Sequence, residues 1–166
     1  MKSLLSLLTI AVCSFLVSCN SGGPSATSKK NLEVNDAIMK AYEAGDFTKM
    51  GDYIAAGAVD HSGEHGDVKG LDSIVSEMKR YRDMMPDMKY TSTKNLADDE
   101  YVFSWSKVSG TLNGQKTEMS SLDISKFKDG KTVEHWVYMD PTEMAKMMQP
   151  QPMPPMSQDS LVPTKK

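Results

Sequence analysis

The chain has 166 residues, of which 39% are hydrophobic and 25% are charged, a composition that fits one globular domain and is too short for two. Its formal net charge of −3 supplies no basic excess, so we expect no nucleic-acid partner. The two cysteines, Cys13 and Cys19, both lie near the N-terminus. We therefore expect no disulfide, thiol nucleophile or cysteine-based metal site in the rest of the chain.

The N-terminus has the pattern of a secretion signal. An apolar segment, residues 4–17, follows Lys2 and is shorter than the ~20 residues that a membrane-spanning helix needs. It ends in Leu-Val-Ser-Cys at residues 16–19, which resembles the lipobox of bacterial lipoproteins. The resemblance implies that residues 1–18 are a signal peptide and that Cys19 is lipidated. An ordinary signal peptide with a chance cysteine is the alternative.

Lipidation would anchor the chain in a bacterial cell envelope. Asn20 stands where an aspartate is associated with inner-membrane retention in some bacteria, so we expect the outer membrane, facing the periplasm. Residues 19–30 carry no large apolar side chain and predict a flexible tether. We expect the folded domain over residues 31–148 and a disordered tail, rich in proline and methionine, over residues 149–166.

Helical periodicity occupies the first half of the domain. Asn31 is predicted to cap a helix that ends at Gly45, and Asp46 a shorter second one. Gly70 precedes the clearest helix, which Pro86 closes. The apolar positions at spacings of three and four are Val34, Ile38, Ala41 and Tyr42, then Phe47, Met50, Tyr53 and Ile54, then Leu71, Ile74, Val75, Met78 and Tyr81.

After Pro86 the period changes to two, which is typical of strands. A short strand-like piece, residues 58–60, precedes this region. Asn113-Gly114 and Asp129-Gly130 predict tight hairpin turns between the later strands. Helices first and an antiparallel meander afterwards predict an α+β domain, in which three helices cover one face of the sheet. A short helix is expected from Pro141 to Met148.

The order of elements and several short motifs are similar to the SnoaL-like, polyketide cyclase-like branch of the NTF2-like superfamily. The motifs are Asp60-His61, Met85-Pro86-Asp87, Ser109-Gly110-Thr111, the segment from Phe127 to Trp136, and Asp140 four residues after Trp136. The resemblance implies a curved sheet wrapped by helices into a cone with an internal pocket. Members include cyclases, isomerases, dehydratases and epoxide hydrolases, and many only bind or dimerise, so the fold does not decide the function.

The resemblance puts Trp136 and Asp140 on the pocket side of the last strand. An aspartate in an apolar cavity would have a raised pKa and could move a proton next to a carbonyl. The alternative is that Asp140 caps the last helix through its Asp-Pro pair. His61 is a candidate assistant at the pocket rim, or an exposed loop histidine.

Other side chains are candidate pocket residues. If the face of its strand is concave, Asp123 is a second pocket carboxylate, sharing that face with Ser121, Met119 and Phe127. Aromatic residues that could line the wall are Tyr42, Tyr53, Tyr81, Phe103 and Trp105, although such residues are more often core. His135 is assigned to the outer face, as the histidine least suited to catalysis.

We expect no cofactor and no metal. The segment His61-x-x-Glu64-His65 has metal-capable side chains, but Gly63 and Gly66 argue against the helix that would align them. Methionines of the last helix and tail resemble periplasmic copper-binding motifs, which leaves copper(I) as an alternative for residues 144–156.

Three functions follow. The first is a membrane-tethered domain that binds a small apolar or amphipathic molecule. The second is a proton-transfer enzyme (isomerase, cyclase or dehydratase) that uses Asp140 with His61. The third is an interaction module in which the sheet face of Val133, Val137 and Met139 forms a homodimer.

Overall fold

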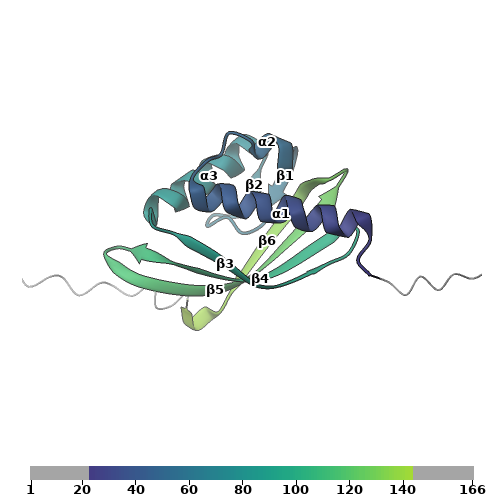
Figure 1. The fold of residues 1–166 in the computed structure, drawn as a ribbon. Coiled ribbons are helices and arrows are strands. Elements are labelled where there is room, and N and C mark those ends of the chain that lie inside the picture. The colour runs from purple at the N-terminus through teal and green to yellow at the C-terminus, as the bar shows by residue number, and fades with distance from the viewer. Residues whose placement is uncertain (1–22, 144–166) are drawn as a thin grey trace, which may run out of the picture.

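A computed structural model describes residues 23–143, which form three helices packed against one face of a curved sheet (Figure 1). The helices are α1 (Ala26–Ala44), α2 (Met50–Tyr53) and α3 (Leu71–Met84), and the strands are β1 (Ile54–Asp60), β2 (Val68–Lys69), β3 (Lys89–Ala97), β4 (Tyr101–Leu112), β5 (Gln115–Lys128) and β6 (Lys131–Met139). The predicted α+β class, with three helices on a curved sheet, is confirmed. Within residues 23–143, none of the helices has the length and hydropathy of a membrane-spanning segment.

The sheet has six strands in the order β2-β1-β6-β5-β4-β3. Strands β3 to β6 are the predicted antiparallel meander, and β1 joins it by pairing parallel with β6. Both predicted hairpin turns are confirmed, because Asn113-Gly114 and Asp129-Gly130 all have positive φ, between 51° and 80°. Such turns match the twist of the strands they join.

The first helix begins earlier than the sequence suggested. Ser25, not Asn31, is the N-cap, and its hydroxyl accepts a hydrogen bond from the Ser28 amide. Asn31 is buried inside the helix, where its side-chain amide donates to the Asp99 carbonyl at 3.2 Å. The prediction of a flexible segment is therefore wrong for residues 26–30, because contacts with the turn after β3 order an extra turn of helix.

The second helix is shorter than expected. Asp46 caps the turn at Thr48 rather than a helix, and Ile54 is already the first residue of β1. The predicted apolar stripes of α1 and α3 are confirmed by the core, in which Ile38, Ile74 and Ile54 pack with Met50 and Ala58.

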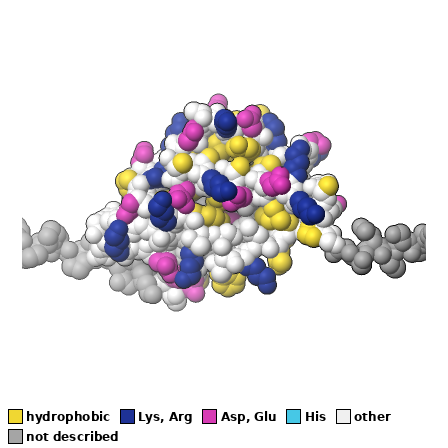
Figure 2. Space-filling model, viewed as in Figure 1, with side chains coloured by type: hydrophobic (Ala, Val, Ile, Leu, Met, Phe, Trp, Pro, Cys, Tyr) yellow, Lys and Arg dark blue, Asp and Glu magenta, His cyan; other side chains and the backbone are white. Residues whose placement is uncertain are grey.

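Charged side chains of both signs are interspersed over the face shown in Figure 2, and apolar side chains gather where the helices approach the sheet. This face therefore carries no block of one sign, in keeping with the small net charge.

Candidate functional site

A cavity of about 420 Å³ lies between the concave face of the sheet and helices α1 and α3. Its volume is within the range of small-molecule sites in proteins. Its wall is mostly apolar and includes seven methionines and three tyrosines, which are Met39, Met78, Met84, Met85, Met88, Met119, Met139, Tyr42, Tyr81 and Tyr90. Methionine is flexible and polarisable, so such a wall adapts to ligands of different shape.

Three ionisable side chains of the cavity lining meet one another. His135 on β6 lies between two carboxylates, with its Nδ1 at 3.2 Å from Asp60 Oδ2 and its Nε2 at 3.9 Å from Asp123 Oδ1. We call these residues the Asp60–His135–Asp123 cluster. Nε2 is buried and has no hydrogen-bond partner among the described residues. A small movement of His135 or Asp123 would let the Asp123 carboxylate accept a hydrogen bond from Nε2 of His135.

Each carboxylate is fixed by a neighbouring serine. Asp60 Oδ1 accepts from both the amide and the hydroxyl of Ser62, which follows β1 in a tight turn. Asp123 Oδ2 accepts from the Ser121 hydroxyl at 2.7 Å. Both aspartates therefore hold one orientation toward His135.

Burial and mutual charge set the protonation of the cluster. Burial works against ionisation of Asp60, but the hydrogen bond and charge of His135, together with the hydrogen bonds from Ser62, outweigh it and lower the pKa of Asp60. For His135 burial favours the neutral ring, while the hydrogen bond and charge of Asp60, then the charge of Asp123, raise its pKa above 6.5. Burial raises the pKa of Asp123. The cluster thus combines the Asp60–His135 pair, which favours the charged forms of both residues, with a carboxyl group whose ionisation burial disfavours.

Two tyrosines of the wall remain protonated donors. Burial raises the pKa of both Tyr42 and Tyr90 to about 12. The Tyr90 hydroxyl hydrogen-bonds to Ser106. The Tyr42 hydroxyl has no hydrogen-bond partner among residues 23–143, so it can donate to a ligand.

The predicted pocket residues divide into two groups. Tyr42, Tyr81 and Asp123 line the cavity as expected, and Ser121 and Met119 confirm that their face of β5 is concave. Tyr53 packs against the core instead. Trp105 and Phe103 lie on the outer face of β4, and Trp105 is 58% exposed, so their placement in the pocket wall is wrong. The inward positions of β4 carry Val102, Ser104 and Ser106.

The assignment of faces on β6 is also wrong, and a β-bulge is the reason. The two-residue turn pairs Lys128 with Lys131, and an unbroken ladder would then pair Asp123 with Trp136. The register shifts by one residue at Val133, so Asp123 pairs with Val137. His135, Val137 and Met139 consequently face the cavity, and the proposed dimer face built on them lies inside the domain.

Asp140 and Trp136 lie outside the lining of the cavity. The carboxylate of Asp140 accepts from the amide and hydroxyl of Thr142, which confirms its interpretation as a helix cap. The helix continues through residues 141–143, and the rest of its predicted range lies outside the described residues.

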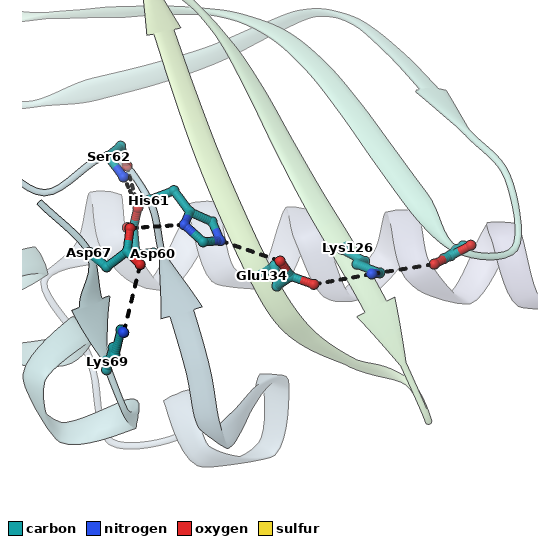
Figure 3. Close-up of polar contacts among 8 residues, drawn as sticks. Asp60, His61, Ser62, Asp67, Lys69, Lys126 and Glu134 are labelled. Carbon is teal, nitrogen blue, oxygen red and sulfur yellow. Dashed lines mark hydrogen bonds and ion pairs between the residues drawn. The ribbon is translucent and has the colours of Figure 1, made fainter.

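His61 belongs to a polar network on the outer face, shown in Figure 3. Its ring stacks on Trp136 at 4.8 Å and lies between Asp67 and Glu134, at 3.0 and 3.3 Å. Glu134 continues to Lys126 at 3.1 Å. The prediction that His61 assists at the pocket is therefore wrong.

The residues between 23 and 143 contain no cluster of histidine, cysteine or acidic side chains arranged to hold a metal ion. Within the His61-x-x-Glu64-His65 segment, Glu64 pairs with Arg80 at 3.4 Å. The methionines proposed for copper(I), from residue 144 onward, lie outside the described residues.

The sequence contains a signal that His135 faces inward. Three residues on the His135 face of β6 are Val133, Val137 and Met139, and the apolar side of a half-buried strand normally faces the core. That pattern favoured His135 over Trp136 as an inward residue.

A family model for SnoaL-like polyketide cyclases matches residues 32–148. The chain belongs to the SnoaL-like polyketide cyclase family. No curated protein shows a significant sequence match to it.

Solved structures share the SnoaL-like fold at low sequence identity. IdmH from Streptomyces antibioticus is 24% identical with a TM-score of 0.61, over 70% of this chain and 96% of that one. A SnoaL-like polyketide cyclase from Agrobacterium tumefaciens is 12% identical with a TM-score of 0.63, over 72% and 98%. An LEH-like epoxide hydrolase from Mycobacterium tuberculosis is 13% identical with a TM-score of 0.63, over 72% and 90%. These likenesses support the fold alone.

Proposed function

We propose that this SnoaL-like domain binds a small amphipathic molecule in its cavity. The observation that supports this most directly is the cavity itself, which has a wall of methionines and tyrosines and includes the Asp60–His135–Asp123 cluster in its lining. The apolar body of the ligand would lie against the wall, and its polar end would meet Asp123. Cavities with few polar groups in an apolar lining are the usual form of small-molecule sites.

Binding can be tested by equilibrium dialysis of the full chain with 2-(1-naphthyl)ethanol, a neutral amphipathic probe. Val108 lines the cavity, and Val108→Trp should fill part of it and lower the affinity at least about tenfold. Lys107→Trp is the matched control, because Lys107 is the adjacent residue on the outer face. Equal binding by wild type and both variants would contradict the proposal.

A second candidate is proton transfer, with Asp123 in place of Asp140. Its support is the raised pKa of Asp123 beside a histidine that Asp60 orients. Deuterium uptake by 2-tetralone at the carbon next to its carbonyl would report this chemistry. Wild type should accelerate the uptake and Asp123→Asn should not; the same rate with both would exclude this role.

We also propose that the domain is tethered to the bacterial envelope through Cys19. The lipobox-like segment supports this, and helix α1 begins at Ala26, which leaves six residues after Cys19 as the link. Fully extended, they span roughly 20 Å. Cys19→Ser should move the protein from the membrane fraction and abolish labelling by palmitate. Retention of both would show that Cys19 is not the anchor.

The outer face of the sheet is proposed to pair two copies of the chain. Leu96, Trp105 and Tyr138 are 55–60% exposed there, and the strand register aligns Trp105 with Leu122 and Tyr138. Ion pairs border this patch at both ends, Lys107–Glu118 at one and Lys126–Glu134 at the other. An apolar centre with a rim of both signs suits a self-complementary interface.

Sedimentation of the full chain at micromolar concentration tests this pairing. Wild type should sediment as a dimer and Trp105→Lys as a monomer, because a charge would enter the apolar centre. Thr117→Lys, which places the same charge outside the patch, is the control. A monomeric wild type would contradict the proposal.

A further inference from the structure

The cavity has an uneven set of charged groups. Its lining includes three carboxylates, Asp60, Glu77 and Asp123, together with His135, but neither lysine nor arginine. A ligand carboxylate or phosphate would therefore find no exposed cation to pair with.

Two of the three carboxylates are already compensated. Asp60 is paired with His135, and Glu77 accepts from Arg80 at 2.7 and 3.1 Å. The nearby Arg82 is engaged elsewhere, donating to the carbonyls of Glu43 and Met85. The remaining carboxyl group, Asp123, accepts one hydrogen bond, from Ser121.

The ring nitrogens of His135 are not accessible to a ligand. One of these nitrogens is held by Asp60, and the other has no accessible surface and points toward Asp123. Asp123 is therefore the charged group of the lining with hydrogen-bonding capacity left for a ligand, beside the neutral hydroxyl of Tyr42, and an ionised carboxylate only accepts.

The surrounding wall also suits a positive charge. Tyr42 and Tyr90 line the same cavity, and aromatic rings attract cations over their faces, as the Tyr81 ring already does with the Arg80 guanidinium at 4.3 Å. An anion is not attracted to the ring faces, and although the Tyr42 hydroxyl can donate to it, the ionised Asp123 repels it.

We propose that the cavity selects an amphipathic amine, with its ammonium group at Asp123 and its apolar body against the methionine wall. This inference rests on the proposed binding function and adds the chemical class of the ligand. Selectivity arises both from the new ion pair and from the repulsion of anions.

Three water-soluble probes with one naphthalene body test the class: 2-(1-naphthyl)ethylamine, 2-(1-naphthyl)ethanol and 1-naphthylacetate. In equilibrium dialysis with the full chain at neutral pH, the amine should bind at least about tenfold tighter than the carboxylate, with the alcohol between them. Asp123→Asn, which keeps the shape of the side chain, should bring the amine to the affinity of the alcohol. Glu118→Gln removes the same charge from the outer face and should leave the preference unchanged.

The outcomes separate this inference from the proposed function. Binding of all three probes with equal affinity, or tighter binding of the carboxylate, would overturn the amine class and leave ligand binding intact. Failure of all three to bind would overturn both. The comparison on wild type does not depend on the folding of Asp123→Asn, and an amine preference that persists in that folded variant would exclude Asp123 as its source.

Discussion

Replacing Asp60 with asparagine is expected to lower the free energy of unfolding by about 2–3 kcal/mol near pH 5.5, the scale of a partly buried hydrogen bond between charged groups. The asparagine side chain would keep the acceptor that holds the turn at Ser62, so the loss should report the partnership with His135. The pKa of His135, followed by the chemical shift of its ring protons, should fall at the same time.

The pH dependence of stability follows from the directions in which the pKa values of His135 and Asp60 are shifted. The pKa of His135 is raised above 6.5, so its contribution is complete below that pH and is lost as the pH rises through the folded value. The pKa of Asp60 is lowered from 3.8, so its contribution is present above that value and is lost as the pH falls through the folded one. The pair should therefore stabilise the fold most between about pH 4 and pH 6.5.

Urea unfolding of wild type and Asp60→Asn at about pH 5.5 and about pH 8.5 measures this effect. As the pH rises from about 5.5 to about 8.5, the free energy of unfolding should fall more for the wild type than for Asp60→Asn. Asp123, with a raised pKa, and His61, raised by Asp67 and then Glu134, act in the same direction, so the variant keeps a smaller dependence. His61→Gln is the matched control, since it removes a titrating histidine of the outer face. Equal pH dependence in wild type and Asp60→Asn would show that the pair does not contribute.

The sequence predicted the parts of the fold that local patterns determine. Gly45 and the two hairpin turns end their elements as expected, because each adopts a positive φ that few residue types accept. Pro86 follows the end of α3 as expected, because proline lacks the amide hydrogen that a helix needs. The apolar stripes of α1 and α3 identified the core, because helical spacing puts those residues on one side.

The site was less predictable, because it depends on register rather than on local pattern. One inserted residue, Val133, reverses which side of β6 faces the cavity, and thereby exchanges Trp136 for His135. The family resemblance predicted that Asp140 and His61 lie in the pocket. The structure instead has Asp60, Asp123 and His135 there. Ser104 on β4 and Ser125 on β5 were not identified as inward residues either, because their shared partner is a polar residue of a distant helix.

That partner is Asn35, and Asn35→Ala is expected to lower the free energy of unfolding by about 2–4 kcal/mol. Its side-chain amide donates to Ser104 on β4 and accepts from Ser125 on β5, both at 3.1 Å, and all three side chains are buried. Alanine would leave two buried hydroxyls without this partner, and it would loosen α1 over the cavity. Urea unfolding measures the loss, and Asp36→Ala, at an exposed neighbour on the same helix, should change stability by no more than about 0.5 kcal/mol.

A combined variant separates the hydrogen bonds from the packing. Asn35→Leu together with Ser104→Ala and Ser125→Ala removes all three polar groups, so no buried donor or acceptor of this bridge remains unsatisfied. It should recover most of the stability that Asn35→Leu loses alone, because the cost of a broken polar bridge lies mainly in the groups left behind. If the single and combined variants lose the same amount, the cost comes from the shape of the side chain. In that case Asn35 would be a packing residue, and the polar inner face of β4 and β5 would need no partner from α1.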